Sequence, residues 1–364
     1  MKIAHLTSVH PQNDNRIFYK ECTTLVKEGY DVALIVAGSE SSVINDINIV
    51  GYEKSQGRLK RILKTSLIDM IKICKKIDAD IYHFHDPELI FTGFYLKMIG
   101  KKVIYDIHEN NPASLLSKPY IKSNLTRKIL AKIFDIFEKS SVRFFDAIVT
   151  ARPDITKRFK HKNIVTLRNF PILPDLEKLK KIDIIKEKPS VIFVGGMTKI
   201  RGINELLDAF ENLDEYELWL LGPIHEDRLS QRIENGCKNV RYLGEVEAYE
   251  IFNYINHADI GIITFLSAPN HLQTLATKPF EYMACGKPMI MSNFSYWQET
   301  FGNSSLYVDP SNSIEIVERV RSLLGDRKLM KKMGEINKKL SKDEYNWEKE
   351  SQKLIKLYRG FRDE

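Results

Sequence analysis

Two stretches of the sequence combine glycines, cations and a carboxylate at positions where a ligand could bind. The first is 195–202 (GGMTKIRG), which directly follows the apolar run 190–194 and precedes a helical pattern. Glycines let backbone N–H groups approach a phosphate, and the guanidinium of Arg201 can add charge-assisted hydrogen bonds. This stretch is a candidate phosphate-binding loop, and a plain strand-to-helix turn with a solvated arginine is the alternative.

The second stretch is 277–288 (TKPFEYMACGKP), in which Gly286 ends a helix of only a few residues. Thr277 can cap this helix, and Pro279 suits its first turn. Glu281 then lies among apolar neighbours, so its carboxylate should either be paired or hold a ligand hydroxyl. A carboxylate that faces water on the helix surface is the alternative interpretation.

In the first half of the chain, polar residues follow several apolar runs. Asp14 and Arg16 lie in the loop after the first run, and His108 follows a later one. A neutral imidazole at a strand end can hydrogen-bond a ligand hydroxyl, while a histidine with a structural partner is the alternative. His83 and His85 alternate on the preceding run, so we expect at least one of them to be structural.

Composition and motifs argue against several classes of protein. Apolar residues make up 43% and charged residues 28% of the 364, which is ordinary for a globular chain. There is no G-x-G-x-x-G after the first apolar run and no G-x-x-x-x-G-K-[ST], which argues against a dinucleotide dehydrogenase and a P-loop NTPase. The four cysteines form no C-x-x-C or Cys/His cluster, so we expect reduced thiols and no metal site. We expect neither a membrane span nor a signal peptide.

Short apolar runs alternate with helical patterns through both halves. Parallel strands need helical crossovers, so this alternation predicts an α/β fold with two doubly wound, Rossmann-like domains that bind ligands beyond the carboxyl ends of their strands. Two prolines and a lysine-rich run after Asn169 predict a linker. We expect domains at 1–170 and 171–344, and a helix at about 345–364 that caps the second domain or crosses back to the first. The expected strands are 2–7, 31–36, 81–85, 102–107, 147–150, 164–167, 190–194, 217–221, 240–243, 260–264 and 288–291.

A strongly basic segment lies at 118–162. It holds twelve basic and four acidic residues, a difference of +8, against +7 for the whole chain. A basic amphipathic helix is typical of a surface that binds anionic membranes, and a helix packed on its own sheet is an equal alternative. Nucleic acid is a poorer interpretation, because no recognition motif accompanies the charge. The basic residues are Lys118, Lys122, Arg127, Lys128, Lys132, Lys139, Arg143, Arg152, Lys157, Arg158, Lys160 and Lys162.

Together these features resemble the retaining glycosyltransferases of family 4 (glycosyl transferases group 1), which have the GT-B fold of two Rossmann-like domains around a cleft. The run EYMACGKP from Glu281 and the 195–202 loop carry the likeness most specifically. The segments KIAHLTSVHP, YHFHDPE, VIYDIHEN, LWLLGP and HADIGIITF extend it over nearly the whole chain. The resemblance implies that the second domain binds a nucleotide diphosphate sugar, and that no metal or other cofactor is needed.

The resemblance also implies roles for residues of the second domain. Glu281 would bind the ribose hydroxyls of the nucleotide. Gln273, eight positions earlier, stands where the family has a glutamate that contacts the donor sugar. The family's phosphate-binding arginine falls on Gly196 and its lysine on Arg201. The expected donor-binding residues are Gly195, Gly196, Arg201, Lys278 and Glu281.

In the first domain, His108 matches a histidine that the family places near the transferred sugar. His108 and Gln273 are therefore the expected catalytic residues, and Asp14 and Arg16 the expected contacts of the cleft loop to donor or acceptor.

We expect a retaining glycosyltransferase of the hexosyltransferase type, cytoplasmic and peripheral at the inner face of the cell membrane. It would transfer a sugar to a saccharide or lipid-linked saccharide in bacterial surface polysaccharide or glycolipid assembly, without a nucleic acid partner. Two alternatives stay open: a nucleotide-sugar epimerase on the same fold, and a non-catalytic nucleotide-sugar-binding homologue. The departures at Gly196 and Gln273 favour the second of these.

Overall fold

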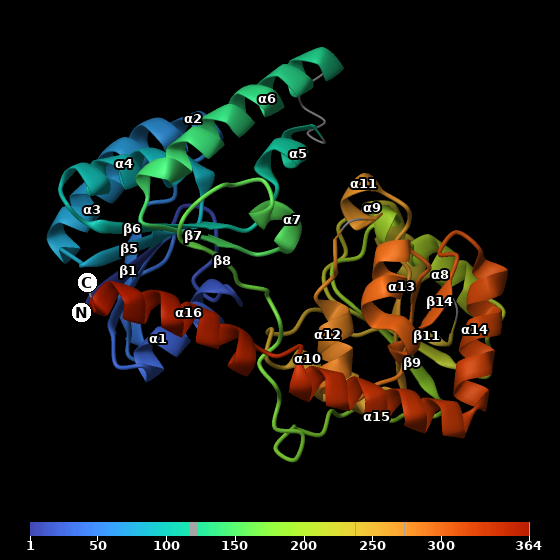
Figure 1. The fold of residues 1–364 in the computed structure, drawn as a ribbon. Helices are drawn as coiled ribbons and strands as arrows, with labels where there is room; N and C mark the ends of the chain where they lie inside the picture. The colour runs from blue at the N-terminus through green and yellow to red at the C-terminus, as the bar shows by residue number, and fades with distance from the viewer. Residues whose placement is uncertain (117–122, 237, 273, 364) are drawn as a thin grey trace. The chain divides into compact units, whose positions relative to one another are not determined.

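The structure is a computed structural model that describes residues 1–116, 123–236, 238–272 and 274–363. The chain forms two compact units (Figure 1), the first made of Met1–Asn169 with Lys349–Glu364 and the second of Phe170–Glu348. Each unit contains one sheet of mainly parallel strands connected by helices, so the predicted α/β fold class is confirmed.

The first unit contains an eight-stranded sheet in the order β3-β4-β2-β1-β5-β6-β7-β8. Only the β3–β4 hairpin is antiparallel. The chain order reverses between β1 and β5, and open α/β sheets bind ligands at such a switch point. The strands are β1 Lys2–Thr7, β2 Asp31–Ala37, β3 Ser42–Ile44, β4 Ile47–Tyr52, β5 Ile81–Phe84, β6 Lys102–Ile107, β7 Ala147–Thr150 and β8 Ile164–Thr166.

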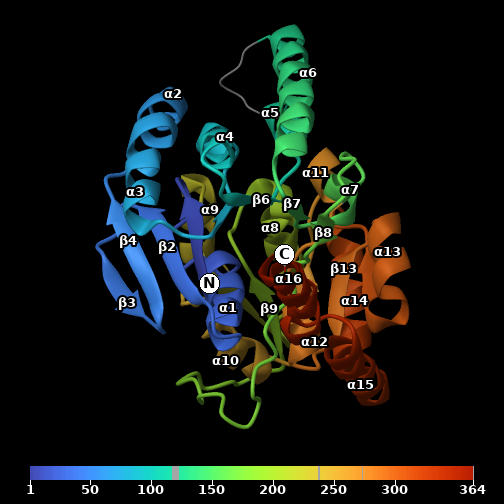
Figure 2. The same cartoon turned by 60° about the vertical axis from the view of Figure 1, so that its left-hand side comes forward.

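Helices cover both faces of this sheet. One face carries α3, α4 and α6, and the other carries α1 and the C-terminal helix α16 (Figures 1 and 2). The core on the first face packs Tyr82, Phe84 and Tyr105 of the strands against α3 and α4. The helices are η1 Ile17–Cys22, α1 Thr23–Lys27, α2 Arg58–Lys60, η2 Arg61–Asp69, α3 Met70–Ile77, η3 Pro87–Leu89, α4 Ile90–Met98, α5 Asn111–Leu116, α6 Asn124–Ser141, η4 Val142–Phe144, α7 Pro153–Thr156 and α16 Trp347–Arg362.

The second unit contains a six-stranded, all-parallel sheet in the order β11-β10-β9-β12-β13-β14. Successive residues of β9 face opposite cores, because side chains alternate along a strand: Val191 and Phe193 pack on one side, Ile192 and Val194 on the other. The chain order reverses between β9 and β12. The strands are β9 Ser190–Val194, β10 Glu217–Leu221, β11 Val240–Tyr242, β12 Ile260–Ile263, β13 Met289–Ser292 and β14 Leu306–Val308.

The helices of the second unit divide between those two cores. Side chains of α8, α9 and α14 fill one core, and those of α10, α12 and α13 fill the other. The helices are η5 Lys199–Arg201, α8 Ile203–Phe210, α9 Asp227–Glu234, α10 Ile251–His257, α11 Pro269–Leu272, α12 Lys278–Ala284, α13 Ser295–Phe301, η6 Gly302–Ser304, α14 Ser313–Gly325 and α15 Arg327–Asp343.

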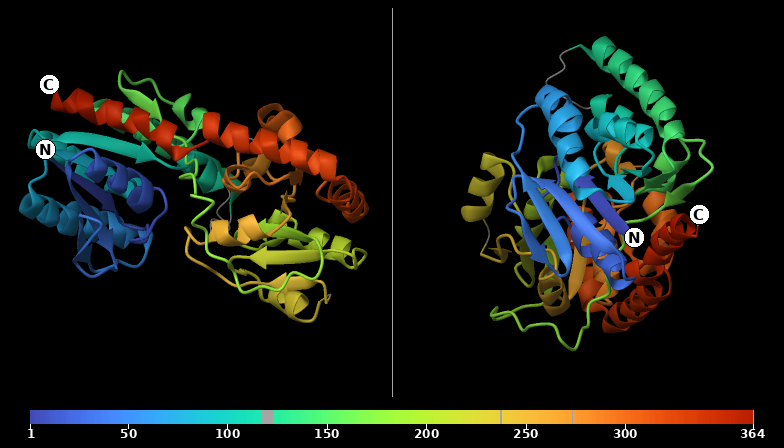
Figure 3. Two further views of the ribbon diagram at one scale, coloured as in Figure 1. Left: turned by 90° about the horizontal axis from the view of Figure 1, so that it is seen from below. Right: turned by 90° about the vertical axis from the view of Figure 1, so that its left-hand side faces the viewer.

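The predicted linker corresponds to residues 167–189, which contain neither helix nor strand (Figure 3). The predicted last helix is α16, and most of it groups with the first unit. At the start of α12, Pro279 occupies the first turn as predicted, but the side chain of Thr277 makes no capping hydrogen bond, so that prediction is wrong. Within the described residues, no helix is both long and apolar enough to span a membrane.

The basic segment 118–162 is not one amphipathic helix. Within its described part it runs through α6, η4, β7 and α7 and ends before β8, while Lys118 and Lys122 lie outside the described residues. Arg158 donates to Asp135 and to Glu138, each at 2.8 Å. Part of the positive charge is therefore neutralised within the unit. The basic residues on α6 itself are Arg127, Lys128, Lys132 and Lys139.

Candidate functional site

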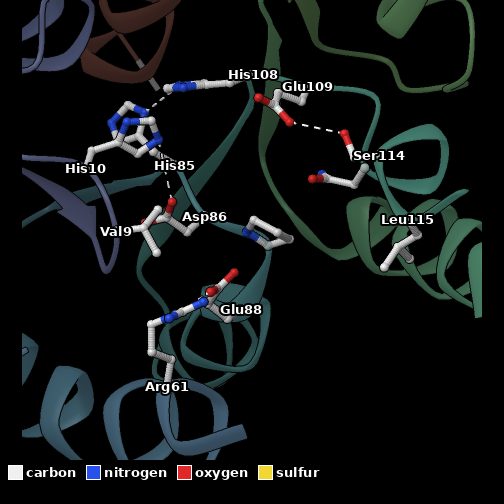
Figure 4. A pocket seen from close by; sticks show the side chains of 12 residues that line it. Val9, His10, Arg61, His85, Asp86, Glu88, His108, Glu109, Ser114 and Leu115 are labelled. Atoms are coloured by element: carbon white, nitrogen blue, oxygen red, sulfur yellow. Dashed lines mark hydrogen bonds and ion pairs between the residues drawn. The ribbon is translucent and has the colours of Figure 1, made fainter. Parts of the chain in front are cut away.

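A pocket of about 370 Å³ lies beyond the carboxyl ends of β1 and β5 in the first unit (Figure 4). His10 follows β1, and His85 and Asp86 follow β5 directly. Asp86 fixes the loop after β1, since its Oδ2 accepts hydrogen bonds from the Thr7 hydroxyl at 2.8 Å and the Ser8 N–H at 2.5 Å. The other lining residues are Val9, Arg61, Pro87, Glu88, His108, Glu109, Asn111, Ser114 and Leu115.

One carboxylate beneath this pocket organises its neighbours. Asp106, at the end of β6, is fully buried and accepts two hydrogen bonds from Arg16, from Nε at 3.0 Å and Nη2 at 3.1 Å. Nε2 of His108 lies 3.0 Å from the same carboxylate, and Nδ1 of His85 lies 3.4 Å from it. Burial alone would raise the pKa of Asp106, but the charge of Arg16 and the contact with His108 hold it well below its usual range. Asp106 is therefore ionised.

The geometry of His108 follows from this contact. Because Nε2 faces an ionised carboxylate, that nitrogen carries a hydrogen and donates it to Asp106. The Nδ1 atom is then the nitrogen that can accept a hydrogen bond from a group in the pocket, which His108 lines. This is how a carboxylate fixes the tautomer of a general base or a substrate-positioning histidine.

Three histidines lie buried behind His108. Nδ1 of His5 lies 2.9 Å from Nε2 of His85, and Nδ1 of His83 lies 2.8 Å from the hydroxyl of Tyr358 on α16. Burial lowers the pKa of His5 and His83 well below the ordinary value and that of His85 to about 4. All three imidazoles are therefore neutral near pH 7.

Some of these groups could in principle hold a metal ion. Atoms of His5, Glu21, His83 and His85 lie within 4.8 Å of one another, as do those of His85, Asp106 and His108. In each group, however, ring nitrogens already face a partner at 2.9–3.1 Å. Those separations fit hydrogen bonds between the groups, so we describe the cluster as a hydrogen-bonded network.

In the second unit, candidate donor-binding residues meet beyond the end of β9. Gly195 follows the strand with a φ of 131°, a conformation that favours glycine. Nη1 of Arg201 donates to the carbonyl of Gly196 at 2.7 Å and so lies against the turn. A Cβ atom on Gly195 would lie 3.9 Å from Cε of Lys278 on α12. Two cationic side chains, those of Arg201 and Lys278, therefore lie close to the turn.

Glu281 stands one helical turn after Lys278. It is 5% exposed, and its Oε2 lies 2.7 Å from Nζ of Lys278. The prediction that this carboxylate would be paired or hold a ligand is thus answered by an ion pair within the unit. The pair leaves the other carboxylate oxygen, Oε1, for a ligand.

The other predicted site residues are Asp14, Arg16 and Gln273, and neither Asp14 nor Arg16 is among the described residues that line the pocket. Asp14 accepts a hydrogen bond from the N–H of Arg16 at 2.8 Å and lies 3.0 Å from Nδ1 of His10. Arg16 is buried against Asp106 and the carbonyl of Leu167. Gln273 lies outside the described residues.

Sequence reasoning did not select Asp86, Glu88 or Arg61, which line the pocket. The run HDPE after β5 is a signal that could have identified the first two, since it follows a strand next to the switch point. Arg61 pairs with Glu88 at 2.8 Å across 27 residues, and no local pattern indicates that contact.

Residues 175–340 match the family of glycosyl transferases group 1, so the match lies within the second unit. Two uncharacterized glycosyltransferases of Methanocaldococcus jannaschii are similar to the chain. One is 24% identical over 78% of this chain and 76% of its own length, the other 26% identical over 47% and 48%. The chain thus spans about half the length of the second relative. The O-antigen chain mannosyltransferase B of Escherichia coli is 24% identical over 69% of this chain and 62% of its own.

Solved structures resemble the chain over its full length. Sucrose-phosphate synthase from Thermosynechococcus elongatus superposes with a TM-score of 0.74 at 16% identity, covering 100% of this chain and 99% of its own. A protein from Anabaena in complex with UDP-glucose has a TM-score of 0.72 at 11% identity, covering 99% and 100%. These likenesses confirm the predicted GT-B fold. The chain therefore resembles the glycosyltransferases of group 1: residues 175–340, within its second unit, match that family, and the whole chain has the GT-B fold.

Proposed function

We propose that the protein transfers a hexose, with retention of anomeric configuration, from a nucleotide diphosphate sugar to a saccharide hydroxyl in the assembly of a surface polysaccharide or glycolipid. The observation that carries the proposal is the turn at Gly195 and Gly196, which Arg201 and Lys278 flank and which lies in the matched region. The UDP-glucose complex of the Anabaena protein and the O-antigen mannosyltransferase support the donor and the setting.

The proposed chemistry assigns a task to each group. Arg201 and Lys278 stabilise negative charge on the departing diphosphate, and Glu281 accepts hydrogen bonds from the ribose hydroxyls. His108, fixed by Asp106, accepts a hydrogen bond from a sugar hydroxyl through Nδ1. The leaving diphosphate takes the acceptor's proton as the acceptor attacks from the same face. The glycosidic bond to phosphate breaks, and a bond from the acceptor oxygen to the anomeric carbon forms.

The direct test is a thermal-shift screen of the full chain against nucleotide sugars, followed by product analysis with the donor that binds. A ligand at 100 times its Kd stabilises a protein by about 2.7 kcal/mol. Transfer to a saccharide with an unchanged anomeric configuration, read by NMR, supports the proposal. A new sugar epimer formed from donor alone would indicate an epimerase, and binding without turnover in any acceptor screen would indicate a non-catalytic homologue.

Glu281→Ala should weaken donor binding by roughly 10- to 150-fold, since hydrogen bonds to a charged group contribute about 1.5–3 kcal/mol. Isothermal titration with the donor found in the screen measures this loss. The matched control is Glu318→Ala, which removes an exposed carboxylate of α14. Equal donor affinity for wild type and Glu281→Ala would show that Glu281 does not bind the nucleotide.

His108→Ala should lower kcat more than it raises the donor KM, because we assign His108 to the reacting sugar. Loss of an interaction made mainly in the transition state has this signature. His161→Ala is a suitable control, since within the described part of the chain the hydrogen-bond partners of the His161 ring are backbone atoms of Asn163 and Phe145. Normal turnover of His108→Ala would leave His108 with a structural role.

We also propose that α6 binds an anionic membrane and brings a lipid-linked acceptor to the first unit. Leu125, Ile129, Ile133 and Ile136 form an exposed stripe along α6, between 50% and 68% accessible. On a helix of 3.6 residues per turn, Lys128 and Lys132 lie beside that stripe, and both are exposed. An apolar stripe flanked by cations suits the boundary between anionic headgroups and acyl chains.

Lys128→Glu combined with Lys132→Glu should abolish co-sedimentation with vesicles that contain anionic lipid. Each cation near such a surface contributes on the order of 1 kcal/mol, screened beyond about 8 Å at physiological salt. The control is the pair Lys331→Glu and Lys332→Glu on α15, which changes the net charge equally. Binding that is absent at low salt, or equally strong on neutral vesicles, would contradict the proposal.

A further inference from the structure

The loops that follow β9 and β10 are joined by backbone hydrogen bonds. Met197 N–H donates to the carbonyl of Pro223 at 2.7 Å, and His225 N–H donates back to the carbonyl of Met197 at 3.2 Å. The two loops therefore form a short parallel extension beyond the sheet, with a bridge between Met197 and Ile224. This arrangement fixes His225 opposite the glycine turn, although 29 residues separate it from Gly196.

The imidazole of His225 occupies the space above Gly196. A Cβ atom on Gly196 would lie 2.7 Å from Nε2 and 3.0 Å from Cδ2 of His225, and 3.1 Å from Nη1 of Arg201. Two nitrogen-bearing side chains thus converge on one backbone position that carries no side chain of its own. Lys278 approaches the neighbouring Gly195 from α12, so three elements bring such groups to a single turn.

His225 is available to a ligand. Its side chain is exposed and makes no hydrogen bond or ion pair with the residues that the structure describes. Two nearby carboxylates point elsewhere: Glu226 accepts from the N–H of Lys199 at 2.7 Å, and Glu281 pairs with Lys278. An imidazole has an N–H donor in both of its protonation states, so it can bind a phosphate oxygen in either.

We propose that His225 is a further contact for the diphosphate of the donor, beside Arg201 and Lys278. This inference rests on the proposed function, because it takes the ligand of that same site to be a nucleoside diphosphate. Since the side chains of Arg201 and His225 converge on Gly196, a phosphate oxygen beside them receives hydrogen bonds from side-chain N–H groups of two loops. Such a cluster discriminates between a nucleoside and its diphosphate.

The test is calorimetric titration of the full chain with UDP, GDP and ADP and with the matching nucleosides. We expect His225→Ala to lose roughly tenfold in affinity for the diphosphate that binds the wild type, with unchanged nucleoside affinity and unchanged melting temperature. His225→Arg should recover most of the loss. The control, Arg228→Ala, removes an exposed cation three residues away and should lose less than twofold.

The possible results distinguish a failure of the His225 assignment from a failure of the proposed donor site. If the wild type binds a nucleoside diphosphate and His225→Ala binds it equally well, the assignment of His225 is overturned while the donor site stands. If nucleoside and diphosphate lose affinity equally, His225 contacts something other than phosphate and the assignment is also overturned. If the wild type binds none of the three diphosphates, the donor site and His225 are overturned together.

Discussion

Mild acid should unfold the first unit before the second. Near pH 7, His5, His83 and His85 are neutral in the fold because burial lowers their pKa values. In the unfolded chain they take up protons as the pH falls through about 6.5, so the unfolded state binds about three more protons. Glu21 acts in the opposite direction. Burial and the neighbouring Asp106 raise its pKa, so at this carboxyl group the folded state binds one proton more than the unfolded state. The net of two protons lowers the free energy of unfolding by roughly 2.7 kcal/mol per pH unit between about pH 6.5 and 4.5.

Two probes can follow the units separately in the intact chain. The three tryptophans, at 219, 297 and 347, all belong to the second unit, so their fluorescence reports its unfolding. Hydrogen exchange of peptides from β1 and β5 reports the first unit. His83→Gln should reduce the slope of stability against pH in the first unit by roughly one proton. Parallel loss of both units, or an unchanged slope in His83→Gln, would contradict the expectation.

Asp106→Asn should be the most destabilising single substitution around the pocket. It removes the charge that partners Arg16, whose side chain is almost completely buried, and breaking one side of a buried ion pair costs about 3–5 kcal/mol. Turnover should fall as well, because His108 loses the carboxylate that fixes its tautomer. Urea unfolding monitored by hydrogen exchange measures the first effect, and kcat with the donor measures the second.

The double variant Arg16→Met with Asp106→Asn keeps this prediction testable if the single variant does not fold. In Asp106→Asn the buried Arg16 keeps only Glu21, at 2.9 Å, as a carboxylate partner among the described residues. Removing both charges takes this buried cation away, so the double variant should be more stable than Asp106→Asn alone. Asp154→Asn is the control, since Asp154 pairs with Arg152 near the surface and such pairs contribute at most about 1 kcal/mol. A loss below about 1 kcal/mol in Asp106→Asn would contradict the prediction.

Most parallel strands could be predicted from the sequence because they are buried on both faces. The residues 103–107 of β6 are all buried and form an almost unbroken apolar run, which is the pattern of a central parallel strand. The sequence did not predict β3, β4 or β14. The three residues of β3 are partly or fully exposed, and β4 and β14 are each only partly buried, so none of them carries such a run. The exposed stripe on α6 has the same helical spacing as a buried face, so spacing alone does not show whether a helix face is covered.

The candidate site was predictable where contacts are local. Gly195 and Gly196 follow a recognisable strand, and Glu281 pairs with Lys278 three residues away. Arg16 lies in the loop after β1, as predicted. Its hydrogen-bond partner Asp106 is 90 residues further along the chain, so the sequence did not indicate that the guanidinium is buried. His225 gave no local signal, because its position depends on a hydrogen bond to Met197 in another loop.

The docking of α16 on the first unit has a consequence for the order of folding during synthesis. Leu354, Tyr358 and Phe361 of α16 are buried, and Tyr358 contacts His83 in β5. The ribosome completes residues 1–169 long before it reaches these three, while the second unit is complete at residue 348. Domains generally fold in the order in which they are made. Here the second unit finishes its core first, and the nascent first unit keeps an uncovered apolar face until the residues of α16 have been made.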